Sequence, residues 1–169
     1  MQTIFVKTFY LEMLAEPKNL ASLELGELSI LKIEKPDADW YRNIYHQVGK
    51  KYSWYNRLLI SAQEVQQLIN RPSIEIYLLK KENEECGFAE LDRSNPENIE
   101  LLYFGIVDSF QGQGMGNVFL RWIIKQVWQG QPKRFWLHTC ELDHPAALGF
   151  YQKAGFVHFD TRNDPQYIP

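Results

Sequence analysis

Three glycines at alternate positions follow an apolar run in the C-terminal half of the chain. Residues 111–116 read QGQGMG, directly after the stretch ELLYFGIVDSF. Glycine destabilises a helix start, so a chain that keeps it there must need the bare backbone. Alternate glycines let several backbone N–H groups point at one spot, where the helix dipole adds partial positive charge. The spacing therefore predicts a phosphate-binding turn at the start of a helix.

Two other phosphate-binding motifs fit this turn less well. A dinucleotide-binding G-x-G-x-x-G motif would need a third glycine at Asn117, and no acidic ribose partner is evident downstream. The Gly-Lys-Ser/Thr ending of a P-loop is also missing from the sequence. The remaining alternative is that Gly112, Gly114 and Gly116 allow a strand and a helix to pack closely. The glycines alone do not separate this interpretation from phosphate binding.

The elements that must position the turn are predicted from apolar patterns. Residues 99–107 are almost continuously apolar, which is typical of a central strand covered on both faces. After the turn, apolar residues recur at helical spacing until Gly130, with Pro132 beyond. Residues 134–142 then read as another strand. The turn therefore joins a buried strand to an amphipathic helix.

A further helix and a last strand are expected near the C-terminus. The helix begins with Asp143 or His144 as its N-cap and Pro145 in its first turn, and it ends at Gly155. The strand covers residues 156–160.

The N-terminal half adds strands and two helices. The first helix begins at Asp37 or Asp39, and the second begins at Ser61, whose spacing to Glu64 forms a capping box. Three strands are expected there, at residues 22–33, 73–81 and 86–92. This order of elements predicts an α/β (α+β) layered domain with a mixed sheet, and the 169 residues suit a single domain, 1–169.

Composition excludes several classes of partner. A net charge of −3 argues against a nucleic-acid backbone as partner. No signal-peptide pattern and no run of about 18 apolar residues occurs, so we expect a cytoplasmic protein without a membrane segment. Cys86 and Cys140 lack metal-type spacing and read as free thiols, and no metal site is expected.

Two stretches of the chain resemble the GNAT superfamily of N-acetyltransferases. Residues 111–116 match that family's Q/R-x-x-G-x-G/A motif, which binds the pyrophosphate of acetyl-CoA. Residues 146–156, AALGFYQKAGF, resemble the helix that follows, with Tyr151 in the place of the family's tyrosine. The helix-opening asparagine of many members is replaced here by Asp-His-Pro at 143–145.

The resemblance implies a single-domain GNAT-like fold, a mixed central sheet flanked by helices, with acetyl-CoA as cosubstrate and no metal. Tyr151 would assist the leaving thiolate. A backbone amide at the end of the central strand would hold the acetyl carbonyl. The implied cofactor-binding residues are Ile106, Val107, Gln111, Gly112, Gln113, Gly114, Met115 and Gly116.

The acceptor amine needs a base, because its pKa is near ~10. Glu100 is the first candidate, since it starts the strand that runs to the turn; the alternative is a solvated charge at a strand end. Glu90 on the neighbouring strand is the second candidate.

The function expected from the resemblance is direct acetyl transfer from acetyl-CoA to a primary amine of a small molecule or a protein. The alternative is a non-catalytic acyl-CoA-binding module. Aromatic residues of the first helical region would either grip an ammonium or pack as a lid: Trp40, Tyr41, Tyr45, Tyr52, Trp54 and Tyr55. A homodimer is the default oligomer.

Overall fold

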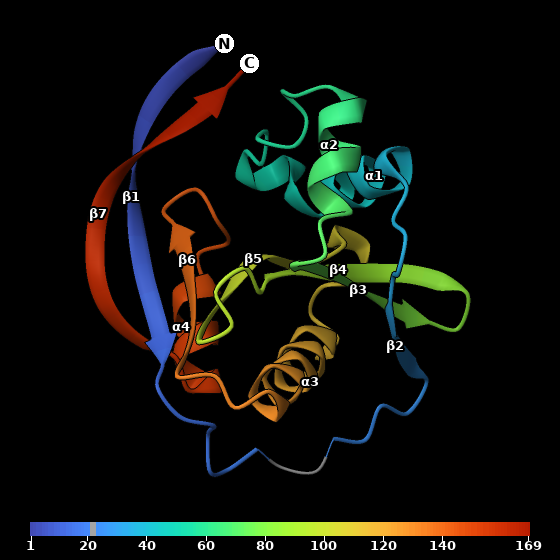
Figure 1. Cartoon of the computed structure of the whole chain (residues 1–169), viewed down its shortest axis with the longest axis vertical. Coiled ribbons are helices and arrows are strands. Elements are labelled where there is room, and N and C mark those ends of the chain that lie inside the picture. The colour runs from blue at the N-terminus through green and yellow to red at the C-terminus, as the bar shows by residue number, and fades with distance from the viewer. Residues whose placement is uncertain (21–22) are drawn as a thin grey trace.

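One sheet runs through the whole of the computed structural model, which describes residues 1–20 and 23–169. Its strand order is β2-β3-β4-β5-β6-β1-β7, and all neighbouring pairs are antiparallel except β5 and β6. Figure 1 shows the sheet between two layers of helices. The strands are β1 (Gln2–Met13), β2 (Leu28–Lys32), β3 (Ile74–Lys81), β4 (Glu84–Asp92), β5 (Asn98–Ile106), β6 (Arg134–Cys140) and β7 (Val157–Ile168).

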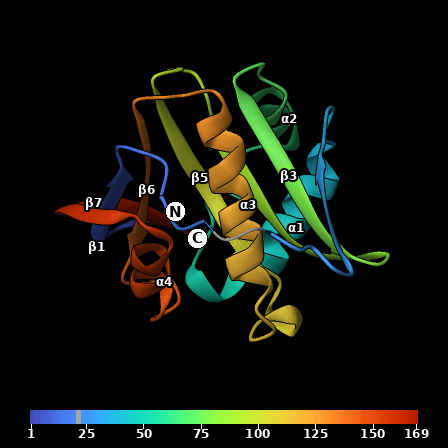
Figure 2. The same cartoon turned by 90° about the horizontal axis from the view of Figure 1, so that it is seen from below.

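The two faces of the sheet carry separate apolar cores. Helices α1 (Ala38–Gly49) and α2 (Ala62–Ile69) cover one face, and α3 (Met115–Gln129) and α4 (Ala147–Ala154) cover the other (Figures 1 and 2). Two short 3-10 helices, η1 (Lys50–Tyr52) and η2 (Asp108–Phe110), follow α1 and β5. The layered α/β arrangement with a mixed sheet is as the sequence predicts.

Local signals in the N-terminal half are also confirmed. The Asp37 side chain accepts hydrogen bonds from the backbone N–H groups of Asp39 and Trp40, so it is the N-cap of α1. Ser61 and Glu64 form the expected reciprocal capping box at α2. Strands β3 and β4, which pair as a hairpin, lie close to the strands expected at residues 73–81 and 86–92.

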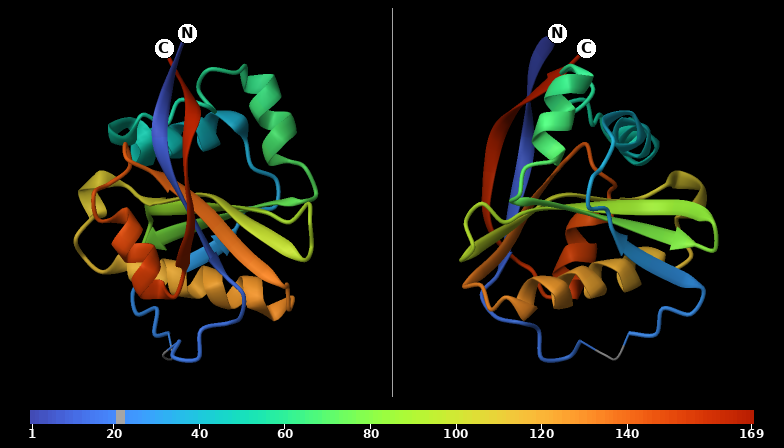
Figure 3. Two further views of the ribbon diagram at one scale, coloured as in Figure 1. Left: turned by 90° about the vertical axis from the view of Figure 1, so that its left-hand side faces the viewer. Right: turned by 45° about the vertical axis from the view of Figure 1, so that its right-hand side comes forward.

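The edge of the sheet beyond β6 differs from the expectation. Strand β1 is not predicted, and β7 extends to Ile168 rather than ending at residue 160. The two strands pair along almost their full length, and Figure 3 shows the chain termini side by side at the end of this strand pair. Residues on β7 are mostly exposed, so the strand lacks the apolar alternation that sequence analysis depends on.

Two other element boundaries need correction. The strand expected at residues 22–33 is observed only as β2, and Ser22 lies outside the described residues. Helix α4 begins at Ala147 with Ala146 as its N-cap, so neither Asp143 nor His144 caps it. Asp143 instead accepts hydrogen bonds from Thr139 and Cys140 at the end of β6. The expected stop is confirmed, because Gly155 ends α4 with a φ of 113°.

Strands β5 and β6 separate shortly after they meet. They pair only from Asn98 with Arg134 to Glu100 with Trp136. On the other side of β5, the register with β4 shifts so that Leu102 is an extra residue between the pairs made by Leu101 and Tyr103. A bulge of this kind bends the strand that carries it. The rest of β5 therefore has an open edge toward β6.

Gly105 lets α1 pack directly on β5, which gives a test of this packing. A Cβ at Gly105 would collide with the Val48 side chain. We expect Gly105→Ala to lower the free energy of unfolding by about 1–3 kcal/mol, because the core there has no space to accept the methyl group. Urea denaturation measures this.

The matched control is Gly149→Ala, within α4, where a Cβ meets nothing within 4 Å. This variant should be unchanged or more stable by up to about 1 kcal/mol, because alanine favours a helix interior. Equal stabilities of the two variants would show that α1 does not rest on Gly105.

Candidate active site

The glycine-rich turn adopts backbone conformations that favour glycine. Gly112 has a φ of 78° and Gly114, the N-cap of α3, has a φ of 80°. A Cβ at either position meets nothing within 4 Å, so the positive φ is the reason for glycine there. A Cβ at Gly116 would make ordinary contacts of 3.5 Å with Ile106 and 3.6 Å with Phe150. Gly116 therefore tolerates a methyl group, whereas Gly112 and Gly114 do not.

Several backbone donors lie free at this turn. The first hydrogen bond of α3 runs from the Val118 N–H to the Gly114 carbonyl. The N–H groups of Met115, Gly116 and Asn117 precede it and have no acceptor within the helix. The Gln111 side chain braces the turn, because its Nε2 donates to the Ile106 carbonyl and to the Tyr52 hydroxyl, each over 3.2 Å.

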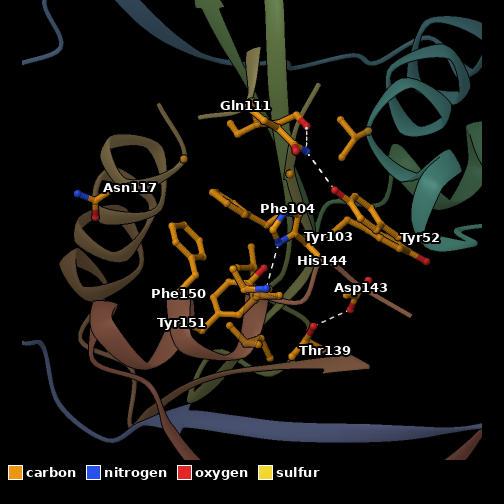
Figure 4. A pocket seen from close by; sticks show the side chains of 18 of the residues that line it. Tyr52, Tyr103, Phe104, Gln111, Asn117, Thr139, Asp143, His144, Phe150 and Tyr151 are labelled. Atoms are coloured by element: carbon orange, nitrogen blue, oxygen red, sulfur yellow. Dashed lines mark hydrogen bonds between the residues drawn. The ribbon is translucent and has the colours of Figure 1, made fainter. Parts of the chain in front are cut away.

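A cavity of about 420 Å³ extends from this turn along the open edge of β5 to α4 (Figure 4). Of the sequence-predicted cofactor residues, Gln113 and Val107 do not line it. The structure brings the others together on its wall: Ile106, Gln111, Gly112, Gly114, Met115 and Gly116. The cavity and the free donors thus share one opening.

At the end of β5, the backbone N–H of Ile106 is free of the sheet, whereas that of Val107 is not. The Val107 N–H donates to the Cys86 carbonyl over 2.7 Å, so it is already used within the protein. In an antiparallel ladder, neighbouring residues direct their N–H groups to opposite sides. The Ile106 N–H therefore points away from β4, toward the open edge and the cavity.

Tyr151 lies on α4 and lines the same cavity. Burial, with a smaller contribution from the charge of Asp143, raises the pKa of its phenol well above the usual value. Its ring packs among Phe104, Phe150 and Phe156. The phenol therefore stays protonated at neutral pH and is a hydrogen-bond donor.

Asp143 is a functional candidate that sequence analysis assigned to a helix cap. Its carboxylate accepts hydrogen bonds from Trp54 Nε1 at 3.0 Å, Thr139 Oγ1 at 2.6 Å and the Cys140 backbone N–H at 2.9 Å. Figure 4 shows Asp143 and Thr139 facing each other at the edge of the cavity. The signal for this residue was only its position three residues after the strand end.

A second cavity of about 190 Å³ lies beyond the opening between β5 and β6. It is lined by residues of β1, β6, β7 and the segment after η1. The residues shared by the two cavities are Trp54, Leu102, Tyr103, His138 and Asp143. The two cavities therefore meet where the strands diverge.

Glu100 does not line either cavity, but it lies behind a residue that lines both. Its Oε1 is 3.9 Å from Nε2 of His138. Burial and the nearby charge of Asp92 raise the pKa of Glu100 to about 7, although Arg134 opposes this shift. Burial lowers the pKa of His138, so its imidazole is neutral at neutral pH.

Glu90, the second candidate base, has a different place in the structure. It is fully buried, accepts a hydrogen bond from the Tyr41 hydroxyl, and pairs with Arg57 Nη2 at 2.7 Å. It lines neither cavity. The expectation that Glu90 could act on a substrate is therefore not supported.

The aromatic residues of the first helical region divide between packing and lining. Tyr52 and Trp54 line the first cavity, and Tyr45, Trp54 and Tyr55 line the second. Trp40 and Tyr41 line neither. Part of this group therefore lines the cavities and part packs in the interior.

Two searches of the described residues gave no further site. Within residues 1–20 and 23–169, no group of three or more His, Cys, Asp or Glu side chains is placed to hold a metal ion. None of the described helices has the length and apolar character to cross a membrane.

Comparison with known proteins relates this chain to acetyltransferases. A family model described as an acetyltransferase (GNAT) domain matches residues 72–158. The "Uncharacterized N-acetyltransferase ycf52" of Porphyra purpurea is 28% identical in an alignment of 166 positions that covers 91% of each chain.

Solved structures share the fold. A GNAT family acetyltransferase from Elizabethkingia anophelis with acetyl-CoA bound has a TM-score of 0.61 and 23% identity, over 79% of this chain and 78% of that chain. The ribosomal-protein-S18-alanine N-acetyltransferase of Escherichia coli has a TM-score of 0.64 and 16% identity, over 82% and 89%. A functionally unknown protein of Staphylococcus epidermidis ATCC 12228, with a TM-score of 0.65 and 18% identity, is matched over 94% of this chain but only 60% of its own.

The glycine turn predicts which substitutions weaken CoA binding. We expect Gly114→Ala to weaken binding of free CoA about tenfold, because an αL backbone costs about 1–2 kcal/mol without glycine. Gly116→Ala should stay within about threefold of the wild type, because its methyl group fits. Titration calorimetry measures both.

Thermal midpoints provide the ligand control. CoA at about 100 times its dissociation constant should stabilise the wild type by about 2.7 kcal/mol, a rise of a few degrees, whereas NAD and ATP should not. A wild type that responds to none of them would mean that the turn does not bind CoA, and an unaffected Gly114→Ala variant would mean that Gly114 is not needed for that binding.

Proposed function

Because the chain belongs to the GNAT acetyltransferase family, we propose that it moves the acetyl group of acetyl-CoA directly to a primary amine. The observation that carries this proposal is the meeting of two cavities at the opening between β5 and β6. One cavity has a cradle of backbone donors and the other does not. Two substrates can therefore reach one point from opposite sides of the sheet.

The first cavity fits acetyl-CoA. The free N–H groups at the start of α3 suit a pyrophosphate, because they combine hydrogen bonding with the positive end of the helix dipole. The open edge of β5 offers backbone groups to an extended arm. Acetyl-CoA supplies the acetyl group as a thioester.

The Ile106 N–H is our candidate for stabilising the oxyanion. Attack on the thioester carbonyl places negative charge on its oxygen. One backbone donor in a site that excludes water contributes about 3 kcal/mol to such a transition state. Ile106 suits this role because it is 9% exposed and its N–H faces the cavity.

Tyr151 is our candidate for assisting the leaving group. As the nitrogen–carbon bond forms and the carbon–sulfur bond breaks, the thiolate gains the electron pair. A phenol that stays protonated can donate a hydrogen bond or its proton to that sulfur.

Glu100 is our candidate base, acting across His138. The acceptor ammonium must lose a proton before attack. His138 lines both cavities and is neutral, so it can take that proton, and Glu100 lies behind it to receive it. A base with a pKa of about 7 is suited to proton transfer at neutral pH.

The function is tested by measuring thiol release from acetyl-CoA with added amines. Tyr151→Phe should lower kcat about 100-fold, because the leaving thiolate loses its donor, with little change in the KM for acetyl-CoA. Tyr167→Phe on β7, which is 45% exposed and lines neither cavity, is the control. A fully active Tyr151→Phe enzyme would remove Tyr151 from the mechanism. CoA binding without transfer to any amine would favour the non-catalytic acyl-CoA-binding module.

Glu100 predicts a pH dependence of rate. The wild-type rate should fall about tenfold per pH unit below the Glu100 pKa of about 7, because the protonated carboxyl cannot accept a proton. Glu100→Gln should be about 100-fold slower at pH 8 and should lose this acidic limb. The matched control is Glu97→Gln, at an exposed position just before β5.

The same variant has a signature in stability that does not depend on activity. Since folding raises the Glu100 pKa, wild-type stability falls as pH rises from the unfolded value through about 7. Glu100→Gln should therefore be more stable than wild type at pH 8 and similar at pH 4. A normal acidic limb in this variant would remove Glu100 from the proton path, whatever its stability.

A further inference from the structure

The wall of the second cavity carries carboxylates and no cationic Lys or Arg side chain in the described part of the chain. The carboxylates are those of Asp143 and Asp164. The carboxylate of Asp143 already accepts three hydrogen bonds. Asp164 accepts one, from the Tyr10 hydroxyl at 2.6 Å, so its oxygens retain capacity for another donor. The cavity therefore has a carboxylate that can accept a hydrogen bond from one cation.

A buried hydroxyl without a partner also lines this cavity. Tyr45 is fully buried, and its hydroxyl, which lies near Tyr103 and the Arg57 backbone, makes no hydrogen bond of good geometry among residues 1–20 and 23–169. A buried polar group without a partner destabilises the protein. In a cavity wall, such a group is free to bond a polar atom of a ligand.

Four aromatic side chains form part of the cavity wall: Tyr45, Trp54, Tyr55 and Tyr103. Tyr45 and Trp54 have ring centroids 5.6 Å apart, and Tyr103 lies 5.0 Å from Tyr45. Ring faces attract an ammonium and also pack well against a compact apolar body. The lining therefore suits an amine attached directly to a small apolar framework.

The cavity is small, and a hydrogen bond between two chain segments crosses one side of it. Its volume of about 190 Å³ is close to the ~150 Å³ of an engineered cavity that binds benzene. Gln166 of β7 donates from Nε2 to the Ser53 carbonyl over 2.7 Å, which joins β7 to the segment after η1. Gln166 itself lines the cavity. A polypeptide acceptor would have to pass its backbone through this bridge.

We propose that the second cavity admits a compact primary amine with one positive charge and a further polar group, and that the Gln166–Ser53 bridge excludes polypeptide acceptors. This inference rests on the proposed acetyl transfer. Asp164 holds the ammonium, the aromatic walls hold the apolar body, and the Tyr45 hydroxyl bonds the polar group. A polycation is disfavoured because a second ammonium would find no free carboxylate in the cavity.

The test compares acceptors of different size and charge in the thiol-release assay with the intact protein. The probes are cyclohexylamine, trans-4-aminocyclohexanol, spermidine, a tetrapeptide with a free N-terminus and an N-blocked lysine peptide. We expect kcat/KM for the two compact amines to exceed that for spermidine and for both peptides at least tenfold. We expect a higher kcat/KM for aminocyclohexanol than for cyclohexylamine, because the hydroxyl of aminocyclohexanol can form a hydrogen bond with the Tyr45 hydroxyl.

Variants assign this selectivity to the cavity. Asp164→Asn keeps an acceptor for Tyr10 and should raise the KM for the compact amines about 10- to 100-fold, with the KM for acetyl-CoA unchanged. Asp160→Asn on the same strand, outside the cavity, is the matched control. Tyr45→Phe should abolish the preference for aminocyclohexanol over cyclohexylamine while the protein remains folded.

Opening the bridge tests the exclusion of polypeptides. Gln166→Ala should raise kcat/KM for the tetrapeptide at least fivefold, whereas Gln129→Ala at the exposed end of α3 should not. Wild-type activity on either peptide that equals the activity on cyclohexylamine would overturn the inference and leave acetyl transfer standing. An unaltered amine KM in Asp164→Asn would do the same. Failure of the proposed function looks different, because no amine or peptide would then release thiol although CoA binds.

Discussion

The site depends on how briefly β5 and β6 pair. Three residue pairs hold the only parallel neighbours of the described sheet together, and the bulge at Leu102 then bends β5 away. If the ladder continued, the Ile106 N–H would be used for sheet pairing and the two cavities would be separated by a closed sheet. Because it stops, β5 keeps free backbone donors in a protein interior, where unpaired groups are otherwise rare. The short pairing of β5 and β6 thus leaves the Ile106 N–H free and also opens the connection between the two cavities.

A buried charged group stabilises this irregular region. Glu90 lies opposite Tyr103 in the β4–β5 register, directly beside the bulge, and it binds Tyr41 of α1 and Arg57 of the following segment. The Arg57 guanidinium in turn lies 5.4 Å from the centre of the Tyr103 ring. Removing one partner of such a buried pair costs about 3–5 kcal/mol. Glu90 therefore holds α1 and a wall of both cavities in place, which accounts for a buried carboxylate at this position.

Sequence analysis succeeded where the backbone conformation requires a particular type of residue. Positive φ at Gly112 and Gly114 requires glycine, and the capping box at Ser61 has its own spacing, so both are readable. It failed for features that arise from distant contacts. Asp143 meets Trp54 across 89 positions, and the second cavity is closed by β7, whose exposed residues carry no periodic signal. Likewise, the choice between Ile106 and Val107 depends on the register with β4, which residue types do not specify.

The two cavities also divide charge between the substrates. Backbone donors at α3 favour an anion on one side of the opening, and Asp143 and Asp164 favour a cation on the other. Asp143 lies at the boundary, where its charge contributes to the raised pKa of Tyr151. An ammonium near Asp143 would offset that charge and so bring the phenol pKa down. The arrival of the acceptor would then make Tyr151 a better proton donor at the moment when a thiolate has to leave, which couples the two sides of the sheet through one carboxylate.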